Sequence, residues 1–186
     1  MRRAAHRGMV AVLRGINVGG HRKVPMAELR ELAEAEGFQD VATYIQSGNL
    51  VFTAGGSAAT AEASLERAIA AHFGFSVDVV VRTADDWASY AAGNPFPDAA
   101  ETRPNHLLLA LSKQPPSPGA EAALRGKASS GERVALRGAA LWVDYVGSVA
   151  RSKLTPAALN KALGSPVTAR NWTTVLKLAE MARSTR

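Results

Sequence analysis

The residues best suited to bind a ligand gather in a glycine-rich segment at residues 14–20, which reads RGINVGG. The segment follows an apolar run, Met9–Leu13, and precedes a helical pattern that begins at Pro25. Glycines between a strand and a helix let backbone N–H groups point into a loop, and such concavities bind anions. The candidate groups here are Arg14, Gly15, Asn17, Gly19, Gly20 and Lys23, with Arg22 beside them.

The same segment also has a structural interpretation. A tight connection needs glycines as well, because glycine adopts positive φ at little steric cost. The spacing matches neither the phosphate-binding G-x-x-x-x-G-K-[ST] loop nor the dinucleotide-binding G-x-G-x-x-G loop, and no Ser or Thr follows Lys23 to hold magnesium. An anion cradle and a tight turn therefore both remain open.

A second polar group lies in the segment YIQSGN at residues 44–49. Its candidate ligand-binding residues are Tyr44, Gln46, Ser47 and Asn49. Hairpin turns use such residues routinely, so an ordinary turn is the alternative. If strands 9–14 and 49–53 are neighbours, this turn lies near one end of the strand that carries Arg14, and the sequence does not say which end.

The third group stands before the last expected helix, where Arg170, Asn171 and Trp172 follow one another. An arginine and an indole at a helix N-terminus could hold a phosphate and stack a ring. Capping by Asn171 and a core Trp172 are the alternative. Lys153, in the segment Arg151-Ser152-Lys153 before the previous helix, would add positive charge or be simply solvated.

Catalytic chemistry is not recognisable in this chain. There are no cysteines, which excludes disulfides, thiol catalysis and cysteine-ligated metals. The four histidines show no metal-ligand spacing, so no metal or cofactor is expected. Asp144 has the opposite strand parity to Tyr145, which predicts that it faces solvent. Catalytic residues and enzymatic activity stay unassigned.

Charge is unevenly distributed along the chain, whose formal net charge is +6. Residues 1–27 contain six Lys or Arg, residues 145–179 contain five, and neither block contains a carboxylate. The two blocks could converge on one positive surface, or the pattern could be chance. No apolar run approaches the ~18 residues that span a membrane, and there is no secretory signal, so a cytoplasmic protein is expected.

Hydrophobic periodicity and turn residues predict the same order of elements in each half of the chain. The first half has a Thr60 cap and a capping box of Thr83 and Asp86, and the second half has a Thr155 cap with Pro156 at the first helical position. The expected strands are 9–14, 41–45, 50–53 and 77–82, then 106–111, 132–137, 140–146 and 167–168. The expected helices start at 25, 60 and 83, then cover 119–126, 155–163 and 172–182.

This order predicts an α+β protein of two ferredoxin-like (split βαβ) subdomains in tandem, each with a trailing helix. The expected limits are a basic, disordered N-terminal extension at residues 1–8, a first subdomain at 9–94 and a second at 105–183. The breaker Asn94-Pro95-Phe96-Pro97 places the boundary near residues 94–104.

Several of these motifs together resemble a bacterial family, the domain of unknown function 1697. The resemblance rests on RGINVGG, KVPM, YIQSGN and NPF in the first half, and on SKLT, TARNW and the pair Lys177-Leu178 in the second. It runs from about residue 9 to about residue 180. It implies an α+β fold of two similar subdomains in a small cytoplasmic protein, and it brings no agreed activity and no catalytic residues.

The hypothesis that follows is a protein that binds a phosphorylated or otherwise anionic small molecule in a cleft between the subdomains, since such sites are common there. One alternative is binding of RNA or single-stranded nucleic acid, which ferredoxin-like sheets and basic termini would suit. Against it, residues 10–13 and 50–53 lack paired surface aromatics. A structural or partner-binding protein without a small ligand is the other alternative.

Overall fold

The computed structural model describes residues 6–185 of the chain. These form two compact units: one contains the described residues up to Ala88 and from Lys177 onward, and the other is Ser89–Leu176. The expected limits of 9–94 and 105–183 stay a prediction. Of the expected extension at 1–8, residues 1–5 lie outside the described residues, whereas Arg7 already begins the first strand.

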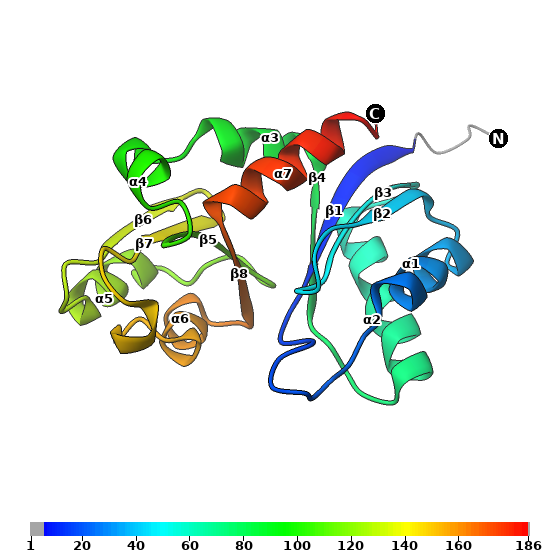
Figure 1. Ribbon diagram of the computed structural model, residues 1–186, viewed down its shortest axis with the longest axis horizontal. Helices are drawn as coiled ribbons and strands as arrows, with labels where there is room; N and C mark the ends of the chain where they lie inside the picture. The colour runs from blue at the N-terminus through cyan, green and yellow to red at the C-terminus, as the bar shows by residue number, and fades with distance from the viewer. Residues whose placement is uncertain (1–5, 186) are drawn as a thin grey trace. The chain divides into compact units, whose positions relative to one another are not determined.

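The first unit is a four-stranded antiparallel sheet in the order β2-β3-β1-β4. Helices α1 and α2 cover one of its faces (Figure 1). This is the split βαβ arrangement, in which β3 separates the two strands that α1 connects. The elements are β1 (Arg7–Leu13), α1 (Met26–Ala35), β2 (Gln39–Thr43), β3 (Asn49–Ala54), α2 (Ala58–Phe73) and β4 (Val79–Thr83).

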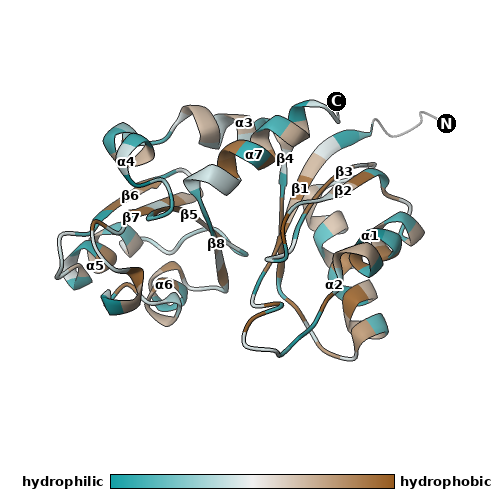
Figure 2. Ribbon diagram, in the orientation of Figure 1, coloured by the Kyte–Doolittle hydropathy of each residue, from teal (hydrophilic) through white to brown (hydrophobic). Residues whose placement is uncertain are grey.

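The core of the first unit lies between this sheet and the two helices. Met9, Ala11 and Leu13 alternate along β1 toward the helices, because successive strand residues point to opposite faces. Leu29 of α1 and Leu65 of α2 pack against them and are fully buried. In Figure 2 the apolar residues of this unit lie mainly along β1 and β3 and on parts of α1 and α2.

Two helix starts in this unit differ from the sequence expectation. The prediction that Thr60 caps α2 is wrong, because the cap is Ser57, whose side chain accepts a hydrogen bond from the Thr60 N–H at 3.1 Å. Pro25 occupies the N-cap position of α1 rather than the first helical position, with ψ of 134°. The first boundary is wrong by three residues and the second by one, and neither changes the buried faces of the helices.

The second unit repeats the architecture. Its antiparallel sheet has the order β6-β7-β5-β8, with α5 and α6 on one face (Figure 1). Thr155 caps α6 and Pro156 follows it, as predicted. The expected strand at 167–168 extends to Asn171. The elements are β5 (Leu107–Ser112), α5 (Ala120–Lys127), β6 (Arg133–Arg137), β7 (Ala140–Asp144), α6 (Pro156–Leu163) and β8 (Val167–Asn171).

A helix trails each sheet: α3 (Ala84–Ala92) after β4, and α7 (Trp172–Arg183) after β8. The capping box at α3 is formed as expected, since Thr83 N–H donates to Asp86 Oδ2 at 2.9 Å and Asp86 N–H to Thr83 Oγ1 at 3.1 Å. The protein is therefore an α+β fold of two similar ferredoxin-like subdomains in tandem. Two short elements were not expected: α4 (Pro97–Thr102) and a 3₁₀ turn, η1 (Val149–Arg151).

Among the described residues, no helix combines the length and the apolar character that crossing a membrane requires.

Candidate functional site

The glycine-rich segment is a small hairpin that projects from the end of β1. Its tip is a two-residue turn, closed by a 3.2 Å hydrogen bond from His21 N–H to Val18 O. Gly19 and Gly20 fill the two central positions with φ of +60° and +76°. Such a turn needs positive φ at both positions, so the two glycines are explained by the turn itself.

Asn17 fastens this hairpin from within. Its side-chain Nδ2 donates to the carbonyls of Val24, at 3.0 Å, and Gln46, at 2.8 Å, while its Oδ1 accepts from Val24 N–H at 2.9 Å. The side chain therefore uses both its donors and its acceptor on the backbone. Asn17 positions the loop.

The turn at residues 44–49 lies at the same end of the sheet, which answers the question that the sequence left open. Asn49 is fully buried opposite Val12, and its Nδ2 donates to Tyr44 O at 2.9 Å and to Ser47 Oγ at 3.1 Å. Leu13 N–H donates to Gly48 O at 2.9 Å. The turn and the glycine hairpin thus form one loop end of the first unit, which also carries Arg14.

A hollow of about 330 Å³ opens at this loop end. Arg14 reaches Asp78 in it at 3.3 Å, and both side chains are about one-third exposed. Glu66 of α2 accepts from Val79 N–H at 2.9 Å. The hollow is lined by Arg14, Arg22, Glu66, Ser76, Val77 and Asp78. Of the residues proposed for the anion cradle, Arg14 and Arg22 line the hollow, whereas Glu66, Ser76 and Asp78 were not predicted.

Arg22 differs from Arg14, the other cation that lines this hollow, in its lack of an ion-pair partner among residues 6–185. Its side chain is exposed and makes no hydrogen bond or ion pair with any residue in the described range 6–185. Its φ is +49°, a conformation that few residues other than glycine adopt. Lys23, next to it, is also exposed but lies outside the hollow.

The predicted residues of the second unit have different surroundings. Arg170 is buried, and its Nη1 donates to Thr168 Oγ1 at 2.9 Å and to Ala169 O at 2.8 Å. Burial lowers the pKa of this guanidinium to about 10, which leaves it charged at neutral pH. Asn171 caps α7 by accepting from Thr174 N–H at 3.0 Å, as one interpretation of the sequence held.

Trp172 packs into the core, with its ring centroid 5.7 Å from that of Trp142. Lys153 is exposed, beside the buried Ser152. These residues belong to the second unit and the glycine hairpin to the first, so their sharing of one cleft stays a prediction.

The prediction that Asp144 faces solvent is wrong. Its carboxylate is fully buried at the end of β7, where Arg103 donates to it through Nε at 2.8 Å and Nη2 at 2.6 Å. Arg133 donates through Nε at 2.8 Å. Burial alone would raise the pKa of Asp144, but the hydrogen bonds from Arg103 and Arg133 outweigh it and hold the pKa below its usual value.

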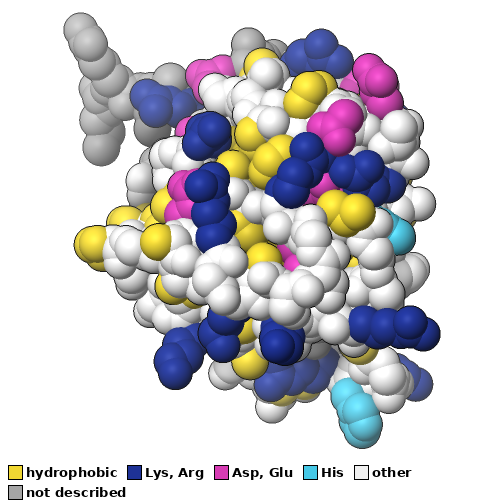
Figure 3. Space-filling view, turned by 90° about the vertical axis from the view of Figure 1, so that its left-hand side faces the viewer, with side chains coloured by type: hydrophobic (Ala, Val, Ile, Leu, Met, Phe, Trp, Pro, Cys, Tyr) yellow, Lys and Arg dark blue, Asp and Glu magenta, His cyan; other side chains and the backbone are white. Residues whose placement is uncertain are grey.

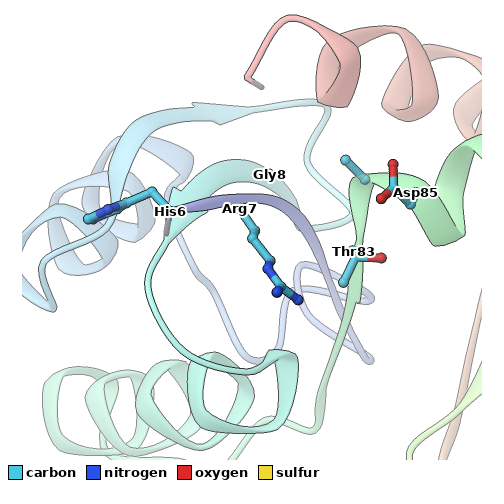
Figure 4. A pocket seen from close by; sticks show the side chains of 6 residues that line it. His6, Arg7, Gly8, Thr83 and Asp85 are labelled. Carbon is cyan, nitrogen blue, oxygen red and sulfur yellow. The ribbon is translucent and has the colours of Figure 1, made fainter. Parts of the chain in front are cut away.

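A larger hollow, of about 410 Å³, lies beside the start of β1 and the start of α3 (Figure 4). His6, Arg7, Gly8, Thr83, Ala84 and Asp85 line it. In Figure 4 the imidazole of His6 points away from Thr83 and Asp85, so the polar groups do not converge on one point. This hollow is therefore a weaker candidate than the one at the loop end.

Lys and Arg side chains are scattered over the face seen in Figure 3, where most Asp and Glu side chains lie in the upper half. The acid-free block at 145–179 contributes the exposed Arg151, Lys153 and Lys161.

Ser152 donates a hydrogen bond to the Glu132 carboxylate. This bond, together with those from the Ser130 and Ser129 N–H groups, lowers the pKa of that carboxyl. No group of three or more His, Asp or Glu in the described part of the chain has the geometry of a metal site.

Comparison with known protein families shows to which family the chain is related. A family model described as protein of unknown function (DUF1697) matches residues 7–142, which is most of the chain. The chain belongs to this family. The DUF1697 match includes the glycine hairpin, the turn at 44–49, Arg103 and Arg133, but ends before Asp144, and its description assigns no activity.

A solved structure has the same fold as this DUF1697 chain. It is the structure of the conserved bacterial protein SP0830 from Streptococcus pneumoniae, with a TM-score of 0.74 and 25% sequence identity. The alignment covers 96% of this chain and 99% of that one, so both subdomains are shared. No curated protein matches the sequence.

Proposed function

We propose that the protein binds a phosphorylated small molecule with hydroxyl groups at the loop end of its first unit, in the hollow lined by Arg14, Arg22, Ser76 and Asp78. The observation that carries the proposal is Arg22, whose side chain has no partner among residues 6–185 and which lines a hollow of about 330 Å³. Small-molecule sites start at roughly 300 Å³.

The charges of the hollow favour a ligand with two kinds of group. Arg22 and the exposed Ser76 hydroxyl offer donors to a phosphate, and guanidinium suits phosphate oxygens because it donates two parallel hydrogen bonds. Asp78 and Glu66 are acceptors and would repel a bare anion, but they accept hydrogen bonds from hydroxyls. A sugar phosphate combines both groups.

The backbone of the hairpin supports the same interpretation. Arg22 keeps a φ of +49°, which costs free energy for a residue with a side chain. Asn17, with three hydrogen bonds, holds the loop in which Arg22 lies. The backbone that carries Arg22 is thereby fixed before a ligand arrives, which reduces the part of the ordering cost of binding that the loop would contribute.

Nucleic-acid binding has less support. The exposed stacking platform of an RNA-binding sheet requires aromatic residues on its central strands. Here β1 carries none, and Phe52 of β3 is buried and stacks on Phe38 with ring centroids 4.5 Å apart.

A thermal-unfolding series with inorganic phosphate, glucose 6-phosphate and glucose at millimolar concentration tests the proposal. Glucose 6-phosphate at 100 times its Kd adds about 2.7 kcal/mol, a rise of roughly 5–11 °C in Tm for a chain of this size. We expect Arg22→Ala to abolish the rise and Arg30→Ala, which removes the same charge from exposed α1, to retain it. A rise that survives in Arg22→Ala, or none with either phosphate, contradicts the proposal. A rise given only by a short RNA and lost with added salt also contradicts it.

A further inference from the structure

The second unit contains a cluster of two arginines and two carboxylates, which is independent of the proposed sugar-phosphate site. In this cluster one of the carboxylates stands where an anionic ligand could bind to the arginines. Arg103 and Arg133 share the buried carboxylate of Asp144 on their inner side. The Nη2 atoms that contact Asp144 also contact a second, outer carboxylate, Asp98 of α4, at 3.3 Å from Arg103 Nη2 and 2.7 Å from Arg133 Nη2.

The inner and outer carboxylates differ in how firmly they are held. Asp144 is fully buried and accepts a pair of hydrogen bonds from Arg103, so it fixes the direction of both guanidiniums. The Asp98 side chain is 56% exposed. An exposed ion pair is screened and contributes little, so the outer carboxylate is the exchangeable one.

The balance of charges in the cluster makes the position of the Asp98 carboxylate selective for an anion. Two guanidiniums and one buried carboxylate leave one unit of positive charge, which Asp98 neutralises. The hydrogen bonds from Arg133 and Arg103 hold the pKa of Asp98 below its usual value, so an ionised oxyanion is the species favoured there. The Arg133 guanidinium lies 4.6 Å from the centroid of the Phe96 ring, a second contact that keeps the guanidinium in place.

We infer that Arg103 and Arg133 form a binding site for a small oxyanion, phosphate or carboxylate, in which Asp98 is a resident carboxylate that the ligand displaces. The ligand takes the two outer hydrogen bonds that Asp98 now accepts. Asp144 remains in place, and Asp98 gives up its ion pairs with Arg103, which caps α4, and with Arg133 of β6.

The experiment measures binding of inorganic phosphate and of acetate to the full chain by calorimetry, in the wild type and in Asp98→Ala. Removal of the resident carboxylate leaves the two guanidiniums exposed, and we expect the Kd of at least one anion to fall about ten-fold. The matched control is Glu101→Ala, which removes an exposed carboxylate from the same helix and raises the net charge equally. Its affinity should equal that of the wild type.

Two further variants distinguish the site from general electrostatics and from the proposed sugar-phosphate site. Adding Arg133→Met to Asp98→Ala should abolish the gain, and adding Arg22→Ala should leave it intact. A gain with phosphate only, or with acetate only, supports the site and identifies the ligand chemistry. The inference is overturned if Asp98→Ala binds neither anion more tightly than Glu101→Ala, or if the gain survives Arg133→Met. Unfolding midpoints of each variant confirm that the folded protein is being compared.

Discussion

The side-chain amide of Asn17 donates to the backbone carbonyl of Gln46 at 2.8 Å, which ties the glycine hairpin to the turn between β2 and β3. With the two bonds to Val24, this one side chain joins segments 29 residues apart. Removing it leaves backbone groups of both segments unsatisfied.

We therefore expect Asn17→Ala to lower the free energy of unfolding by about 2–3 kcal/mol, from lost hydrogen bonds and from an alanine forced to φ of +55°. Asn17→Gly separates the two causes, because glycine tolerates that φ and should recover roughly 1 kcal/mol. Urea unfolding measures both. Equal stability of the two variants would show that backbone strain plays no part.

Gly48 should resist substitution more than any turn glycine with open space around it. A Cβ there would lie 2.5 Å from Ile16 Cδ1 and 3.0 Å from Leu13 Cβ, at a φ of +84°. We expect Gly48→Ala to cost about 3 kcal/mol, from overpacking and strain together. Gly138→Ala is the control, since φ is +57° but nothing lies within 4 Å, and should cost about 1 kcal/mol. Denaturant midpoints that coincide would refute the packing argument.

Ile45 is a β-branched residue in the left-handed region, with φ of +50° and a side chain 47% exposed. Asparagine tolerates this conformation, so Ile45→Asn should raise the free energy of unfolding by about 1 kcal/mol. Val18→Asn, at an exposed apolar position of the same loop end without positive φ, should change it by less than about 0.5 kcal/mol. A loss of stability in Ile45→Asn would mean that the isoleucine makes a contact worth more than its strain.

The buried carboxylate of Asp144 should make the free energy of unfolding decrease at acidic pH. Its pKa is lowered in the folded protein, so its contribution is present above the unfolded pKa of about 3.9 and is lost as the pH falls through the folded value. Asp144→Asn should cost about 3 kcal/mol at pH 7, because it breaks a buried pair. The gap between wild type and variant in urea unfolding should then narrow below about pH 4. A gap independent of pH would show that shape rather than charge accounts for the loss.

The fold was predictable because its signals are local. The box of Thr83 and Asp86 and the cap at Thr155 begin helices where the structure has them. The prediction for Asp144 was wrong because alternation along a strand indicates solvent exposure only if one face of the sheet is exposed. Strand β7 is buried along its whole length. The partner Arg103 is 41 residues away, in the segment 94–104 for which the sequence predicted only a boundary between subdomains.

The candidate site was harder to predict than the fold, because the sequence does not distinguish an asparagine that stabilises a loop from one that binds a ligand. Asn17 and Asn49 belong to the first kind. The hollow depends on Glu66 and Asp78 meeting Arg14 and Arg22 across long sequence separations, which no local pattern encodes.

The first unit is built from two stretches of chain, since it includes the residues from Lys177 onward as well as those up to Ala88. The position where a Gly8 Cβ would lie is 3.0 Å from Thr185 Oγ1, so the last residues pack beside the start of β1. On the ribosome, the second unit is continuous and is complete before the first. All four strands of the first unit's sheet have been synthesised by Thr83, but the segment from Lys177 onward can join this unit only after the 88 residues Ser89–Leu176 have been made.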